Sequence, residues 1–148
     1  MQRLVYWLVF PLLWIISKLP FPIFYLVSDF VFFLVFYIFR YRRRTVQENL
    51  RLVFPEKPEE ELGRIEKKFF SHMVDMFLEM IKSISISHKE LKKRFRLTNI
   101  EELRKMESQG KSILMACGHY ASYEWMTALQ LYGIAYKGFG VYKQVKNP

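Results

Sequence analysis

The sequence lacks several features that mark common classes of protein. It has one cysteine, Cys117, in 148 residues, so no disulfide can form within the chain, and its soluble part is compatible with a reducing cytoplasm. It contains no internal repeat and no low-complexity tract. His72 and His88 have no partners at metal-ligand spacing, which indicates structural or surface roles. No zinc-finger, helix-turn-helix or RNA-binding signature is present, and aromatic residues gather where charges are absent, so no nucleic-acid partner is expected.

Acidic residues are few, and charge of either sign is scarce in the first quarter of the chain. Lys and Arg outnumber Asp and Glu by 23 to 14, for a formal charge of +9, yet residues 1–39 contribute only Arg3, Lys18 and Asp29. The length suits one domain with an appendage, and we expect a membrane anchor at 1–39 and a basic domain at 40–148. The excess positive charge favours anionic lipid headgroups or acidic acyl carriers as partners.

Two apolar runs make up the expected anchor. Residues 4–16 are wholly apolar, and the Lys18, Pro20 and Pro22 that follow offer no small-x-small cleavage site for a signal peptide. Residues 19–39 have only Ser28 and Asp29 as polar members and are long enough to span a bilayer as a helix. Basic residues at 40 and 42–44 then place this end in the cytoplasm. One span, a hairpin, a re-entrant anchor around the two prolines, and core helices of a soluble protein all remain open.

Helical patterns fill the middle of the chain. Thr45 and Glu48 have capping-box spacing at the start of a short amphipathic helix over 45–54. A helix of about 25 residues is expected from Glu59 onward. Its apolar stripe is predicted to pack in the core, although it could also line an acyl pocket; it consists of Leu62, Ile65, Phe69, Met73, Met76, Phe77, Met80 and Ile81. Asn99 and Glu102 predict another capped helix, which ends at Gly110.

The last third of the chain predicts an α/β fold. Residues 112–117 form an apolar run without polar alternation, which is typical of a strand buried on both faces of a parallel sheet. A helix over 122–132 and a strand over 134–141 would complete a βαβ unit with a right-handed crossover. The whole chain is therefore expected to hold anchoring helices, further helices and the start of a parallel sheet.

His119 and Glu124 lie where such a sheet would place a site, beyond the carboxyl end of the first strand. A carboxylate that accepts from one imidazole nitrogen fixes the tautomer, and the other nitrogen can then take a proton from a substrate hydroxyl. This is the logic of the hydrolase triad without an enzyme nucleophile. A histidine that merely caps the strand is the simpler interpretation of the pair. A third hypothesis makes Cys117 an acyl-accepting nucleophile, although a cysteine inside a buried strand usually only packs.

The block GHYASYEW at 118–125 resembles the His-x4-Asp/Glu block of the glycerolipid acyltransferase superfamily, in the form found in bacterial lipid A biosynthesis acyltransferases. The apolar N-terminus, RRTVQENL at 43–50 with Phe54-Pro55, and VYKQVKNP at 141–148 are also similar to that family. The block departs from the family's common Gly-Asn-Trp at Ala121, Ser122 and Tyr123. Lys143 stands where many members have an arginine, so an ammonium point charge replaces a guanidinium that can donate two hydrogen bonds at once.

The resemblance implies that His119 is the general base, with Glu124 as its partner. The reaction would move a fatty acyl group from an acyl-carrier-protein or CoA thioester to a hydroxyl of a lipid A precursor or another membrane lipid. It also implies substrate contacts at Gly118, Tyr142, Lys143 and Asn147, no metal or bound cofactor, and a place on the cytoplasmic face of the bacterial inner membrane. Members of the family continue for roughly as long again, so we expect an N-terminal fragment whose groove is incomplete. The alternative is a non-catalytic, membrane-anchored or interaction protein.

Overall fold

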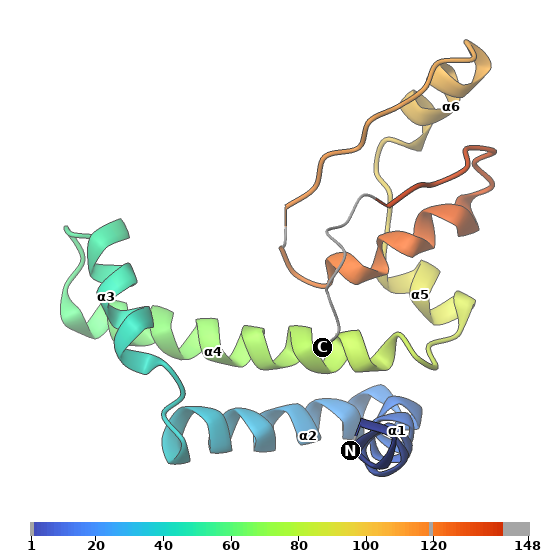
Figure 1. Cartoon of the computed structure of the whole chain (residues 1–148). Coiled ribbons are helices and arrows are strands. Elements are labelled where there is room, and N and C mark those ends of the chain that lie inside the picture. Colours follow the sequence, from blue (N-terminus) through green and yellow to red (C-terminus); the bar gives the residue numbers. More distant parts are fainter. Residues whose placement is uncertain (1, 119, 141–148) are drawn as a thin grey trace. The chain divides into compact units, whose positions relative to one another are not determined.

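The computed structural model describes residues 2–118 and 120–140, with side chains from residue 6 onward, and its regular elements are helices (Figure 1). In chain order they are α1 (Gln2–Lys18), α2 (Phe21–Phe33), the π-helix η1 (Leu34–Ile38), α3 (Arg43–Val53), α4 (Glu59–Lys82), α5 (His88–Arg94), α6 (Ile100–Ser108) and the 3₁₀-helix η2 (Tyr123–Tyr132). The chain divides into two compact units. The first contains the residues up to Ser87 together with Gly118–Trp125, and the second contains His88–Cys117 and the residues from Met126 onward.

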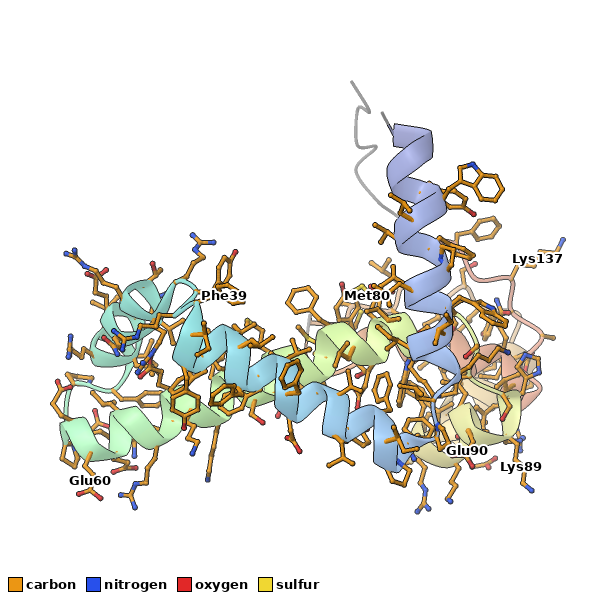
Figure 2. All side chains as sticks on the ribbon, turned by 90° about the horizontal axis from the view of Figure 1, so that it is seen from below. Phe39, Glu60, Met80, Lys89, Glu90 and Lys137 are labelled. Carbon is orange, nitrogen blue, oxygen red and sulfur yellow. The ribbon has the colours of Figure 1, made fainter. Side chains whose placement is uncertain are left out.

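In the first unit, α1 and α2 form one layer on the same side of α4. Figure 1 shows both beside one face of α4, and Figure 2, seen from below, shows them in front of it. Prolines at 20 and 22 start α2, because proline fits the first turn of a helix, and η1 continues it. The labelled Phe39 lies near the Glu60 end of α4, with Met80 farther along, so α2 and α4 run in opposite directions (Figure 2).

The core of the first unit lies between these two layers. Phe24, Val74 and Leu78 are buried together, and apolar residues of α1, α2, η1 and α4 pack around them: Ile16, Leu19, Phe21, Tyr25, Val31, Phe32, Val35 and Ile81. Farther along the same interface, the rings of Phe36 and Phe70 meet edge to face at 5.5 Å. The contact therefore extends from the start of α2 into η1.

Among the described residues of this unit, every buried polar side chain has a hydrogen-bond partner. The ammonium group of Lys82, 6% exposed, donates to the carbonyls of Ser17 at 2.6 Å and Leu19 at 2.5 Å, and so caps the end of α1 with a positive charge. Ser28 donates to Asp75 at 2.5 Å. Glu66, 3% exposed, accepts two hydrogen bonds from Arg43, the shorter at 2.8 Å. These contacts tie α1, α2 and α3 to the same long helix.

The second unit is held mainly by side chains that bond to backbone. The Tyr132 hydroxyl donates to the Phe95 carbonyl at 2.6 Å, and its ring lies 5.0 Å from the Lys92 ammonium. The Tyr136 hydroxyl donates to the carbonyl of Lys111 at 2.7 Å. In this unit Leu91 and Ala128 are the buried apolar residues among those described.

The expected parallel sheet is not formed. No strand is present in the described residues, and 112–117 and 134–140 have no regular secondary structure. Leu114 is 94% exposed, whereas a strand covered on both faces would bury it. A strand needs a neighbouring strand for its backbone groups, and the described part of the chain offers none. The predicted helix over 122–132 is present as the 3₁₀-helix η2.

Two local predictions also need correction. The helix expected from a Thr45 cap begins at Arg43, without a side-chain cap, and Glu48 pairs with Arg44. Helix α4 has about the expected length, 24 residues. Its buried row, however, is Leu62, Glu66, Phe70, Val74, Leu78 and Lys82. Three members of the predicted stripe, Phe69, Phe77 and Met80, are exposed instead.

Candidate functional site

Gly118–Trp125, the segment that carries Glu124, belongs to the first unit. Trp125 anchors it, with only 7% of the residue exposed. Its indole N–H donates to the Ser83 hydroxyl at 3.1 Å and lies 3.4 Å from the carbonyl oxygen of Glu79. Because the ring is buried and its N–H is hydrogen-bonded, Trp125 fixes both the position and the orientation of the chain at this point.

Glu79 is the second anchor of this segment. One carboxylate oxygen accepts from the Tyr25 hydroxyl of α2 at 2.7 Å, and the other accepts from the Ser122 hydroxyl. Hydrogen bonds to a charged carboxylate are stronger than those between neutral groups. A single side chain of α4 therefore holds both the apolar layer and the segment that carries Glu124.

Glu124 itself stands at the start of η2 and is exposed. Just before it the backbone turns sharply at Ala121, which has a left-handed φ of 50°. A hydrogen bond to the Glu124 carboxylate raises the pKa of Tyr123 above its ordinary value, and burial and the charge of Glu124 act in the same direction. A carboxylate has two oxygens and can accept further bonds, so Tyr123 leaves capacity for an imidazole donor.

The structure places only part of the predicted site. Gly118 is exposed at the start of the anchored segment, while His119, Tyr142, Lys143 and Asn147 lie outside the described residues. The pairing of His119 with Glu124 thus stays a prediction. The sequence gives no sign that Glu79, Tyr25 and Ser83 hold this segment, because no local pattern joins residues that are about 40 to 100 positions apart.

Cys117 is exposed as a free cysteine, contrary to the expectation that it lies inside a buried strand. In the described part of the chain, no three residues among the histidines, cysteines and acids are grouped to hold a metal ion. A cavity of about 150 Å³ lies between α3 and the first two turns of α4, at the opposite end of α4 from Trp125; it is lined by Gln47, Leu50, Arg51, Glu59, Leu62, Gly63 and Glu66.

Comparison with known proteins defines the class. The model of the bacterial lipid A biosynthesis acyltransferase family matches residues 1–148, so the chain belongs to that family. This confirms the resemblance inferred from the sequence.

Among curated proteins, the chain is similar to the lipid A biosynthesis lauroyltransferase of Escherichia coli (strain K12). The two are 25% identical over 142 residues, which is 96% of this chain and 46% of the relative. The chain thus spans about half the length of the curated relative that it matches. No solved structure matches the chain significantly.

Proposed function

We propose that this chain contributes the general base and its carboxylate partner to an acyltransferase that acts on a lipid A precursor. The observation that carries the proposal is the family match over all 148 residues, which includes the His119 and Glu124 block. The anchoring of the Glu124 segment by Trp125 and Glu79 supports it, because general-base catalysis needs a fixed geometry.

In the proposed reaction, His119 removes the proton from an acceptor hydroxyl while Glu124 accepts from the other imidazole nitrogen. The acceptor oxygen attacks the carbonyl carbon of an acyl-carrier-protein thioester. A new ester bond forms, the carbon–sulfur bond breaks, and the imidazolium returns its proton to the departing thiolate. Tyr142, Lys143 and Asn147 are proposed to contact the substrate, and the Lys143 ammonium suits a phosphate as a point charge.

We place the reaction at the cytoplasmic face of the bacterial inner membrane. Among the described residues, Phe21–Ile38 is the helix that is long and apolar enough to enter a bilayer, which supports membrane attachment. Arg40, Arg42 and Arg44 follow it and are exposed, and basic residues beside an apolar segment are attracted to the anionic cytoplasmic leaflet.

The test compares acyl transfer by the full-length protein with that of His119→Ala, using an acyl-carrier-protein thioester and a lipid A precursor. Loss of a general base lowers the rate by roughly 100-fold or more. Glu124→Gln should lower kcat with little change in KM, because the amide keeps the shape and loses the charge. Glu60→Gln, an exposed acid on α4, is the matched control and should keep full activity.

A drop of less than about tenfold in His119→Ala would count against the base role. Full activity in Cys117→Ala is expected, since the thiol has no step in this reaction. Abolished transfer in that variant would favour the thiol-nucleophile hypothesis instead. Binding to anionic vesicles without transfer to any hydroxyl acceptor would favour a non-catalytic membrane protein.

A further inference from the structure

The α2–η1 helix has two apolar faces, and only one is covered. Phe24, Ser28 and Phe36 are buried toward α4. On the other side a second stripe has spacings of three and four and exposed fractions of 44% to 67%: Ile23, Leu26, Phe30, Phe33 and Tyr37. Asp29, the one acid of this stretch, is about 100° round the helix from Phe30 and so lies beside the stripe. The outer stripe is a continuous and exposed apolar surface, although Tyr37 at its end also lies near α4, where the Lys67 ammonium is 6.0 Å from its ring centroid.

The composition of the α2–η1 helix would let it cross a bilayer, but α4, which packs against it, carries too many ionisable groups to enter the hydrocarbon core. Along the shared interface, Tyr25 bonds to Glu79 at 2.7 Å and Ser28 bonds to Asp75 at 2.5 Å. Lys67 lies 6.0 Å from the ring centroid of Tyr37, toward the other end. If α2 spanned the membrane, α4 would take these ionisable groups into the hydrocarbon with it. Such groups are costly there.

The arrangement of α1 fits a helix pair that lies flat. Both helices occupy the layer on one side of α4, and α1 crosses the direction of α2 within that layer (Figures 1 and 2). The exposed large apolar residues of α1 include Trp7, at 71%, and Leu8, at 69%. Both helices of the layer thus expose large apolar residues, and α4 with its charges lies on one side of the layer.

Charges at the ends of α2 match the headgroup region. Lys18 precedes the helix, and Arg40, Arg42 and Arg44 follow it, all exposed. Basic residues beside an apolar surface attract anionic lipid, and long basic side chains reach the headgroups from helix ends. A neutral protein partner would explain the apolar stripe but not this placement of positive charge at both ends.

We infer that the α1–α2 layer lies in the plane of an anionic bilayer surface, with the outer stripe of α2 in lipid and α4 on the aqueous side. Both ends of α2 then face the same compartment. The inference rests on the membrane attachment proposed above, but not on the acyl-transfer chemistry.

Cysteine labelling tests this orientation in the full-length protein. In a Cys117→Ser background, Lys18→Cys and Tyr41→Cys place single thiols before and after the helix. In inverted inner-membrane vesicles, a membrane-impermeant maleimide should label both, and in right-side-out vesicles it should label neither. Glu60→Cys on α4 is the control for a position that the reagent reaches from the aqueous side.

Labelling of the two thiols from opposite sides would overturn the inference in favour of a spanning helix. Labelling of both from the periplasmic side would keep the flat orientation and overturn only the proposed cytoplasmic face. These outcomes are independent of whether the protein transfers acyl groups.

Depth measurement gives a second, independent test. Fluorophores attached at Ile23→Cys, Phe30→Cys and Tyr37→Cys sit along about 21 Å of helix. In vesicles of brominated phosphatidylcholine and phosphatidylglycerol, a flat helix predicts that the same bromine position quenches all three most strongly. Deep quenching at residue 30 with shallow quenching at 23 and 37 would indicate a span. No quenching at any of them would mean that protein, not lipid, covers the stripe.

Discussion

The two units of the chain differ in how they bury apolar residues. The first buries Phe24, Phe36, Leu62, Phe70, Val74, Leu78 and Trp125, whereas the second buries Leu91 and Ala128 among the described residues. Long helices satisfy their own backbone and can devote whole faces to packing. The apolar run at 112–117 would need neighbouring strands to do the same, and Leu114 remains exposed. An apolar segment therefore becomes part of a core only where another part of the chain offers an apolar surface that it can pack against.

The sharpest test of this difference uses one leucine from each unit. Leu78 and Leu91 are 7% and 8% exposed, so solvent exposure does not distinguish them. Leu78→Ala opens a cavity in the cluster with Phe24 and Val74 and should cost about 4 kcal/mol of unfolding free energy. Leu91→Ala should cost about 2 kcal/mol, because fewer buried neighbours surround it. Urea unfolding followed by tryptophan fluorescence measures both, and equal costs would contradict the comparison.

Two arginines of similar exposure give the next test. Arg43, 28% exposed, pairs with the buried Glu66, and Arg94, 30% exposed, pairs with the half-exposed Glu90 at 3.5 Å. Arg43→Ala leaves a buried carboxylate without its cation and should cost about 3 kcal/mol. Arg94→Ala should cost under about 0.5 kcal/mol, as expected of a solvated helix pair. A thermal shift in Arg94→Ala as large as that in Arg43→Ala would place comparable electrostatic stabilisation in the second unit.

Glu79→Ala tests how the first unit holds its distant segment. It removes the acceptor for Tyr25 and Ser122, and the loss of two charge-assisted bonds should loosen Gly118–Trp125 by about 2 kcal/mol. Hydrogen exchange of the amides at 120–125 should then speed up roughly 30-fold, since each 1.4 kcal/mol is tenfold. Glu60→Ala on the same helix is the control. Unchanged exchange in Glu79→Ala would mean that Trp125 alone anchors the segment.

The smallest effect expected is on pH dependence. Burial raises the pKa of Glu66, but hydrogen bonds from Arg43 and Gln47 and the charge of Arg43 outweigh it, so the net pKa lies below the ordinary value. The folded state therefore gains stability above the unfolded pKa of about 4.3 and loses it as pH falls through the lower folded value. Acid unfolding of wild type and Glu66→Gln should show less pH dependence below about pH 4 in the variant. A variant with the same acid sensitivity would exclude Glu66 as the source.

The sequence predicts the long helices well and their packing faces poorly. The acids at 59–61 and the apolar periodicity locate α4, since both signals are local. The prediction of its buried row was wrong, because Glu66 and Lys82 are charged yet buried, and each has partners from elements far away in sequence. Apolarity alone therefore favoured Phe69, Phe77 and Met80, which are exposed.

The site was predictable only as far as its residues are contiguous. Glu124 follows Gly118 within one block, so resemblance to a family could single it out. Glu79 lies 43 positions before its partner Ser122 and has no pattern around it that distinguishes it from other acids of α4. The expected sheet was wrong for a related reason, because a small-apolar run does not specify the neighbouring strands that it needs.

The cap that Lys82 places on α1 can form only late in synthesis, because its two partners are far apart in the sequence. The carbonyl of Ser17 precedes its ammonium donor by 65 positions. At about 5–20 residues per second, α1 is made roughly 3 to 13 s before that donor exists, and α2 roughly 2 to 10 s before it. During this interval the bilayer surface can shelter the apolar layer, and α4 then folds onto a surface that is already laid out. In the orientation inferred above, lipid thus covers the outer stripe of α2 before α4 covers its inner face.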